Sequence, residues 1–249
     1  TIEQALPVIH PQAYENTRVF TGEPMENPTA FDEGSGETGN LSVALGSASD
    51  ITGYNWFTAT KQAGEYIKGT ALSGAPTDAG DYWLDVVFQE SKSKTTKAAT
   101  IGFGLTVKPQ TDEQTVNPDA YTVYANRAHT YEVDLSSYLS DLRLGTDVTY
   151  QLTNGSLAQP YRLDGQDVSL SSDGKLTIPV ASHALPEPNT YPIATLVFWV
   201  QSSNYSRITL TLEVRMTPKA EGKLDVSMPC WTYGTIGTAT YYISGTKET

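Results

Sequence analysis

The segment at residues 76–86 constrains the fold of this chain more than any other. It reads Pro-Thr-Asp-Ala-Gly-Asp-Tyr-Trp-Leu-Asp-Val, so turn residues lead directly into an alternating strand with a tyrosine at its start. In a two-sheet β-sandwich, a tyrosine at this place folds its hydroxyl back onto the backbone a few residues upstream. Tyr82 is therefore predicted to pin a corner between two sheets. Leu84 stands where a disulfide cysteine would come, so the sandwich is expected to pack without a disulfide.

The amino-acid composition supports an all-β chain and argues against some classes of binding partner. The 249 residues include 15 Tyr and 4 Trp, which suit pleated surfaces, and they suffice for about two domains. The net charge of −12 argues against a nucleic-acid or anionic-membrane partner, because both require clustered Lys and Arg. Cys230 is the single cysteine, so no disulfide forms within the chain.

Alternating apolar residues predict the strands. In the strand after the corner, Leu84, Val86 and Phe88 share the core face with Tyr82, whereas Trp83 faces the other way. A similar alternation over residues 208–216 predicts another strand with one buried face, and Ser-Asp-Gly-Lys at 172–175 predicts a tight hairpin. Residues 193–200 are interpreted as a central strand that is apolar on both faces.

The expected organisation is a series of tandem antiparallel β-sandwiches. Residues 1–109 form the first sandwich, the polar stretch at 110–119 is a linker because prolines bracket it, and residues 120–218 form the second. Residues 219–249 are expected to begin a further module or to extend the second sandwich. The chain starts without an initiator Met, carries no signal peptide and holds no apolar run long enough for a bilayer, so it is expected to be a piece of a longer protein.

Four short motifs keep a familiar order. They are Phe-Thr-Gly-Glu-Pro at 20–24, Ile-Thr-Gly-Tyr-Asn-Trp at 51–56, the corner at 76–82 and Leu-Thr-Val-Lys-Pro at 105–109. Residues 15–109 thereby resemble the MBG-type immunoglobulin-like modules of Gram-positive surface proteins, and the second segment is loosely similar to cadherin-like repeats. The resemblance implies tandem immunoglobulin-like sandwiches in an extracellular stalk or adhesin on a bacterial cell surface, and it implies no catalytic residues.

Candidate ligand-binding residues are exposed aromatic side chains, since a ring can stack on a sugar. Trp83, Trp231 and Tyr233 are the predicted set, although rings on a sandwich can equally be covered by a neighbouring module. A metal site is not predicted, because the three histidines are scattered and the acidic residues form no calcium loop; cadherin-like junctions leave calcium open. The histidines are His10, His129 and His183, and the acidic candidates are Asp112, Glu113, Asp119, Asp164, Asp167 and Asp173.

The expected function is non-catalytic: a structural or adhesive segment that needs no cofactor and contacts adjacent modules and a surface protein or glycan. A carbohydrate-binding accessory module of a larger extracellular hydrolase is the alternative. An enzyme ranks third, because the sequence offers no nucleophile, base and orienting group in a recognisable set. A Lys-to-Asn isopeptide bond, as in some Gram-positive adhesins, also stays open.

Overall fold

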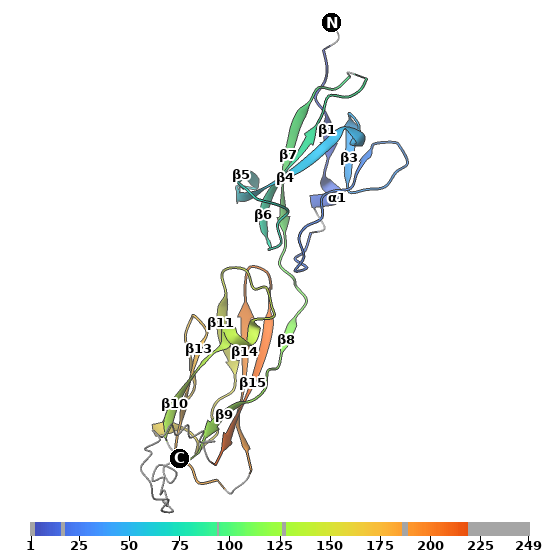
Figure 1. Cartoon of the computed structure of the whole chain (residues 1–249). Helices are drawn as coiled ribbons and strands as arrows, with labels where there is room; N and C mark the ends of the chain where they lie inside the picture. The colour runs from blue at the N-terminus through green and yellow to red at the C-terminus, as the bar shows by residue number, and fades with distance from the viewer. Residues whose placement is uncertain (1–2, 16–17, 94, 126–127, 186–188, 219–249) are drawn as a thin grey trace, which may run out of the picture. The chain divides into compact units, whose positions relative to one another are not determined.

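The computed structural model describes residues 3–15, 18–93, 95–125, 128–185 and 189–218 (Figure 1). Its contacts divide the chain into two compact units. Unit 1 holds Thr1–Glu113 together with the short segments Leu142–Val148 and Gln201–Arg207, and unit 2 holds the remaining described residues. The predicted start of a further module at 219–249 lies outside the described residues. Each unit is built from two β-sheets, which confirms the all-β fold class.

Unit 1 combines a three-stranded and a four-stranded sheet. In the smaller sheet, β3 lies between an antiparallel and a parallel neighbour, and in the larger sheet all pairs are antiparallel. The smaller sheet has the order β1 (Val8–His10), β3 (Leu41–Leu45), β2 (Ala30–Asp32). The larger has the order β5 (Glu65–Ala71), β4 (Ile51–Gln62), β6 (Gly80–Phe88), β7 (Ala99–Val107). The helical turns are α1 (Gln12–Glu15) and the 3-10 turn η1 (Ala48–Asp50).

The core of unit 1 follows the predicted alternation. Leu84, Val86 and Phe88 of β6 are buried, as predicted, and alternate residues of β7 and β3 are buried too. Tyr14 of α1 adds an aromatic ring that lies edge-on to Phe103 at a centroid distance of 6.2 Å. Burial of these side chains is the main term that stabilises such a sandwich. The remaining buried members include Leu41, Val43, Trp56, Leu105 and Val107.

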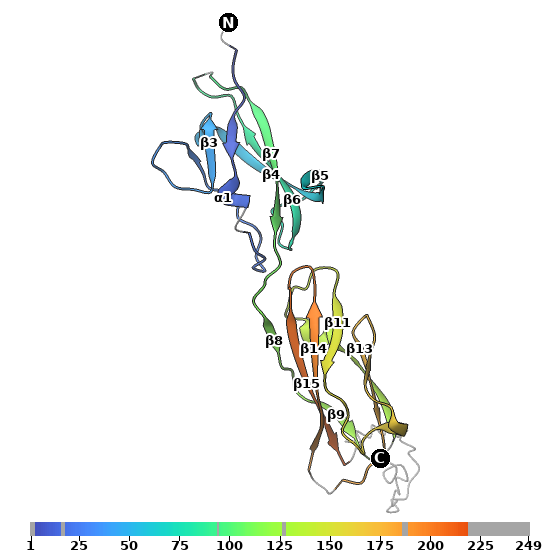
Figure 2. The ribbon, with the colours of Figure 1, turned by 180° about the vertical axis from the view of Figure 1, so that it is seen from behind.

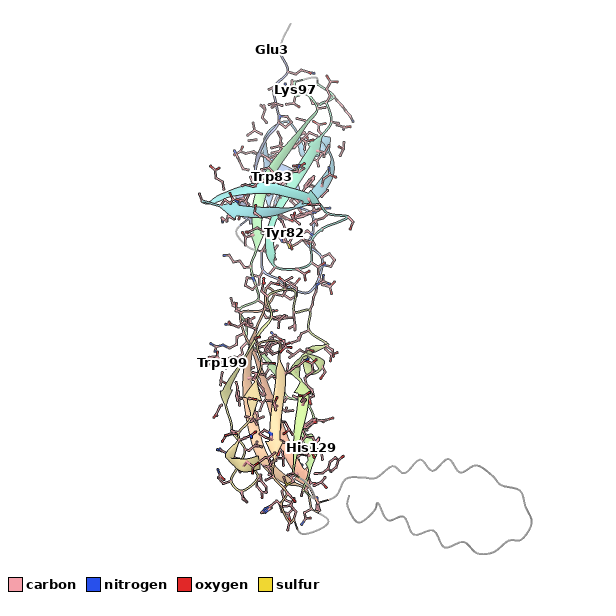
Figure 3. All side chains as sticks on the ribbon, turned by 90° about the vertical axis from the view of Figure 1, so that its left-hand side faces the viewer. Glu3, Tyr82, Trp83, Lys97, His129 and Trp199 are labelled. Atoms are coloured by element: carbon pink, nitrogen blue, oxygen red, sulfur yellow. The ribbon has the colours of Figure 1, made fainter. Side chains whose placement is uncertain are left out.

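The β4–β5 hairpin of unit 1 crosses the outer face of the larger sheet. Its turn residues Ala63 and Gly64 both have positive φ, at 50° and 90°, which gives the twist that a two-residue hairpin requires. Figure 3 shows this hairpin crossing β6 and β7 at the level of Trp83, and β5 contacts both strands. One side of the hairpin therefore covers side chains that would otherwise face solvent.

Unit 2 also combines two sheets. The first has the order β10 (His129–Asp134), β13 (Lys175–Val180), β12 (Ser169–Leu170), with antiparallel pairs. The second has the order β11 (Thr149–Asn154), β14 (Tyr191–Gln201), β15 (Ile208–Thr217), β8 (Gln114–Val116), and β9 (Tyr121–Tyr124) also pairs with β15. The 3-10 turns are η2 (Leu135–Leu139) and η3 (Leu163–Gly165).

The last strand of unit 2 confirms the prediction for residues 208–216. The five inward side chains of β15 are fully buried, and all of them except Ile208 share one core cluster with Phe198, Ile178 and Leu176. They are Ile208, Leu210, Leu212, Val214 and Met216. Gly174 has φ 85° in the predicted turn at 172–175, which connects β12 to β13.

Two features differ from the expectations. β8 lies within the stretch 110–119 that the sequence assigns to a linker, because its three residues complete the edge of a sheet despite their polar neighbours. β14 is a central strand, as predicted, but only one of its two faces is buried. Thr195 and Trp199 are exposed on one face, whereas Leu196 and Phe198 are buried on the other.

β15 is flanked by two strands from the beginning of unit 2. It pairs in parallel with β8, where Ile208 is opposite Gln114, and with β9, where Thr217 is opposite Tyr124. Both neighbours run beside β15 in Figure 1 and, from behind, in Figure 2. The first and last strands of the unit therefore run side by side in the same direction.

Candidate binding surfaces

Tyr82 forms the predicted corner. Its hydroxyl donates a hydrogen bond to the carbonyl oxygen of Asp78 over 2.9 Å, and burial raises the pKa of the Tyr82 phenol, which keeps it protonated as a donor. Beside it lies an open groove of about 310 Å³, lined by Tyr82, Thr58 and residues 72–78. Tyr82 thus lines the groove, while its hydroxyl is hydrogen-bonded to the backbone of Asp78.

The Asp78 carboxylate gathers a second set of partners within unit 1. Arg143 donates from Nε over 2.5 Å and from Nη2 over 3.0 Å, and the buried Asn204 donates from Nδ2 over 2.9 Å. Hydrogen bonds from Arg143 lower the pKa of Asp78 more than burial raises it. Asn204 Oδ1 in turn accepts the backbone N–H of Ala79 over 2.7 Å. These polar groups fix the loop before β6 and are already satisfied by one another.

Trp83, a predicted sugar platform, is partly buried beneath the β4–β5 hairpin (Figure 3). Its indole Nε1 donates to Asp85 Oδ1 over 2.8 Å, and Lys68 Nζ contacts the other carboxylate oxygen of Asp85. Lys68 also lies 3.6 Å from the centre of the Phe57 ring, a cation–π arrangement. A side chain at Gly102 would collide with the indole, since an added Cβ would lie 2.3 Å from Trp83 Nε1. The polar edge of Trp83 is engaged inside the protein.

A neighbouring cluster of side chains around Tyr66 covers the same face of the larger sheet. Tyr66 of β5 reaches across the sheet, where its hydroxyl lies 2.7 Å from Thr106 Oγ1, which donates to Asp81 Oδ1 over 2.5 Å. Lys61 Nζ donates to the Tyr66 hydroxyl over 3.2 Å. An added Cβ at Gly104 would lie 2.0 Å from Tyr66 Cγ, so the ring packs directly on the glycine backbone. This surface is a closed polar and aromatic layer.

The other two predicted binding residues, Trp231 and Tyr233, lie outside the described residues. The three histidines have separate surroundings. His10 Nδ1 is 3.9 Å from Glu33 Oε2, His129 lies edge-on to Tyr131 at 4.8 Å, and His183 lies edge-on to Tyr161 at 5.0 Å.

Among the acidic candidates for calcium, Asp167 has its oxygens occupied. Arg162 Nη2 lies 2.8 Å from Oδ2, and Oδ1 accepts the backbone N–H groups of Leu157 and Val168 over 2.9 and 2.8 Å. Asp173 pairs with Ser171 in the hairpin turn. Within the ranges that the structure describes, no group of three His, Cys, Asp or Glu side chains is arranged to hold a metal ion.

Sequence reasoning missed Trp199. This side chain is 39% exposed on the outer face of β14, and Figure 3 shows it on the flank of unit 2. The register places Trp199 opposite Thr209 of β15, and Thr209 opposite Thr115 of β8. The signal was the alternation of Thr195 and Trp199 with buried neighbours, which Val197 on the same face obscured.

Comparisons with known proteins give no family. No protein-family model matches the chain, and no curated protein matches it. Among solved structures, a protocadherin γB7 EC3–6 cis-dimer aligns with 86% of this chain and 49% of its own at 12% identity and a TM-score of 0.30. Mouse protocadherin γC3 EC1–3 aligns with 83% and 68% at 12% identity and a TM-score of 0.27. A Bacteroides ovatus protein, SGBP-B in complex with a mixed-linkage heptasaccharide, aligns with 85% and 48% at 14% identity and a TM-score of 0.19.

The chain thus spans about half the length of the protocadherin γB7 structure. In the described part of the chain, none of the helices is long and apolar enough to span a membrane. What the geometry defines is an all-β protein of two double-sheet units.

Proposed function

We propose that this chain is a non-catalytic structural and adhesive segment of a secreted bacterial surface protein, in which immunoglobulin-like modules, the first of MBG type, act as a stalk under tension. The observation that carries the proposal is the parallel pairing of β8 and β9 with β15. A stalk must keep its length while the bound partner and the cell pull on its two ends. The first and last strands of each module then receive the force directly.

Parallel pairing is the geometry that resists such a pull. Force enters unit 2 at the start of β8 and leaves at the end of β15, so the two strands are drawn in opposite directions along their lengths. The hydrogen bonds between Gln114–Val116 and residues 208–210, and between Tyr121–Tyr124 and residues 214–217, are then loaded together in shear. In an antiparallel hairpin pulled from its open end, the bonds break one after another. Forced unfolding depends on the barrier to unfolding, so shared loading favours a long lifetime.

Unit 1 carries a shorter version of the same arrangement. Val19 bridges Lys108 in parallel, Phe20 N donates to Lys108 O over 2.8 Å, and Lys108 N donates to Arg18 O over 3.0 Å. Lys108 directly follows β7, the last strand of that unit's larger sheet. This pairing joins an early segment to the end of the unit, which supports the same role for unit 1 with fewer bonds.

Single-molecule force spectroscopy on the full chain tests the proposal with two pairs of attachment points. In a Cys230→Ser background, cysteines replacing Thr111 and Pro218 load β8, β9 and β15 in shear. Cysteines replacing Thr190 and Pro218 pull the open end of the β14–β15 hairpin, where Tyr191 is opposite Met216. We expect a clearly higher unfolding force for the first pair. Equal forces, or a lower force for the first pair, would remove the basis for a tension-bearing role.

A further inference from the structure

Asn154 and Gly155 form the only Asn-Gly pair in the 249-residue sequence, and Asn154 is the last residue of β11, an edge strand of unit 2. The side chain of Asn154 is exposed and folds back along the chain. Its Oδ1 accepts a hydrogen bond from the backbone N–H of Gly155 over 2.9 Å. The side-chain amide carbon of Asn154 is bonded to this oxygen, so it is held beside the nitrogen of the next peptide group.

The fold requires glycine at position 155. Gly155 has a φ of 106°, in the region that L side chains rarely adopt, and a Cβ added there would lie 2.2 Å from the backbone oxygen of Thr195 in β14. Asn154 is therefore followed by the residue whose nitrogen has no neighbouring side chain to hinder its approach to the amide carbon. Packing on β14 and a reactive Asn-Gly pair thus depend on the same glycine.

We propose that Asn154 is a site of self-modification, at which the chain converts its own asparagine to aspartate and isoaspartate and thereby loosens the edge of unit 2. The Gly155 nitrogen loses its proton to solvent and attacks the amide carbon of Asn154. A C–N bond forms, and the side-chain nitrogen leaves as ammonia after it takes up a proton. Water then opens the five-membered imide ring at either carbonyl. The reaction consumes one water, releases one ammonia and needs no cofactor.

The two products change the charge and the length of the main chain. Either product adds a negative charge, and isoaspartate also places an extra CH2 group in the backbone. The backbone around Asn154 lies along β14, since Thr153 Oγ1 donates to Val197 O over 2.9 Å and Ala158 N donates to Ile193 O over 3.0 Å. An extra backbone atom between these two contacts shifts one of them out of register. We therefore expect β11 to pair less firmly with β14 as the protein ages.

This proposal does not depend on the mechanical role proposed above. β11 lies at one edge of the second sheet, whereas β8 lies at the other edge, beside β15. The pairing of β8 and β9 with β15 can carry tension whether or not Asn154 has been converted, and the two experiments have separate readouts.

Peptide mapping by mass spectrometry tests the proposal on the full 249-residue chain, incubated at neutral and at mildly alkaline pH. Digestion at mildly acidic pH prevents conversion during preparation, and electron-transfer fragmentation separates aspartate from isoaspartate. We expect Asn154 to convert about tenfold or more faster than Asn40, whose Oδ1 accepts the backbone N–H of Thr29 over 2.8 Å. The rate should rise with pH, because the nitrogen attacks in its deprotonated form.

The same measurement on the urea-unfolded chain shows what the fold contributes. The fold holds the Gly155 nitrogen beside the side chain of Asn154, so the folded chain should convert at least as fast as the unfolded chain. A conversion rate that depended on the Asn-Gly sequence alone, with the fold protecting the pair, would give the opposite order.

Asn154→Gln is the matched variant. It keeps a side-chain amide but lengthens the side chain by one CH2 group, so the same attack would have to close a larger ring. This variant should remain unconverted at position 154. Hydrogen exchange over residues 149–158 should become faster when the parent chain is aged, and it should stay the same when Asn154→Gln is aged. Thermal unfolding of the fresh variant shows that it is folded.

The proposal is overturned if Asn154 in the folded parent chain converts no faster than Asn40. It is also overturned if the folded chain converts clearly more slowly than the unfolded chain, because the fold would then protect the Asn-Gly pair. Equal hydrogen exchange over residues 149–158 in the fresh and the aged parent chain would equally overturn it, since conversion would then leave the edge of unit 2 unchanged.

Discussion

The Tyr82 hydroxyl donates a hydrogen bond to the carbonyl oxygen of Asp78, four residues earlier in the chain. This hydrogen bond joins the beginning of β6 to the loop that precedes it, and both residues lie in unit 1. Replacing Tyr82 with Phe removes the donor and leaves a partly buried carbonyl oxygen. We expect unit 1 to lose about 1 kcal/mol of unfolding free energy, as is typical for one such bond. Urea unfolding followed by hydrogen exchange measures this loss of unfolding free energy and assigns it to one unit. Unchanged exchange rates in residues 76–88 would contradict the expectation.

Low pH should reduce the stability that the Asp78 carboxylate gives to the same loop. The pKa of Asp78 is lowered chiefly by the hydrogen bonds from Arg143, with Asn204 adding to the effect. A lowered folded-state pKa means that the stabilisation is complete above the unfolded-state pKa of about 4 and is lost as the pH falls through the lower folded value. Asp78→Asn should therefore lower the melting temperature of unit 1 at neutral pH and reduce its further fall in acid.

Thermal unfolding at several pH values between about 7 and about 2.5 measures this difference. Glu37→Gln, in an exposed loop of the same unit, is the matched control for losing one negative charge. A parallel pH profile for Asp78→Asn and the parent chain would show that the carboxylate does not contribute.

The contact of Tyr66 with the backbone of Gly104 leaves no space for a side chain. Gly104→Ala places a Cβ 2.0 Å from Tyr66 Cγ, so the β4–β5 hairpin has to move off β7. Overpacking of this kind costs about 1–3 kcal/mol. Gly53→Ala is the control, because nothing lies within 4 Å of a Cβ there. Thermal unfolding compares the two, and equal melting temperatures would show that the hairpin is not packed on the sheet.

Calcium should not stabilise the second unit through Asp167. Both oxygens of this carboxylate are occupied, by Arg162 and by the backbone N–H groups of Leu157 and Val168. We expect the same melting temperature with calcium and with excess chelator. A melting temperature that rises with calcium and falls back in Asp167→Asn would assign a metal to this residue after all.

Sequence reasoning predicted best the strands in which neighbouring residues alternate between a buried and an exposed face. Leu84, Val86 and Phe88 alternate with residues of the other face, and the same is true of residues 208–216, because one buried face imposes a period of two. The turn at 172–175 was equally readable, since Gly174 supplies the positive φ that the hairpin needs.

The binding surfaces were harder to predict, because their exposure depends on distant segments. Trp83 does lie opposite the core face, but the β4–β5 hairpin folds over it, and no local pattern reports such a crossing. Trp199 was read as part of an apolar strand because Val197 shares its face. β8 has three residues in a polar stretch, and its pairing with β15 becomes visible only in the folded sheet.

The pairing of β8 and β9 with β15 also has a consequence for biosynthesis. Gln114 is made early in unit 2, but its partner Ile208 follows only after the rest of the sandwich has been synthesised. During translation, β8 and β9 therefore emerge before β15 has been synthesised. Their backbone groups cannot pair with β15 until that strand also leaves the ribosome. Exposed strand edges of this kind invite pairing with other chains. A nascent chain that stalls before Thr217 would present this open edge to its neighbours, whereas a chain that reaches Thr217 can close it with β15.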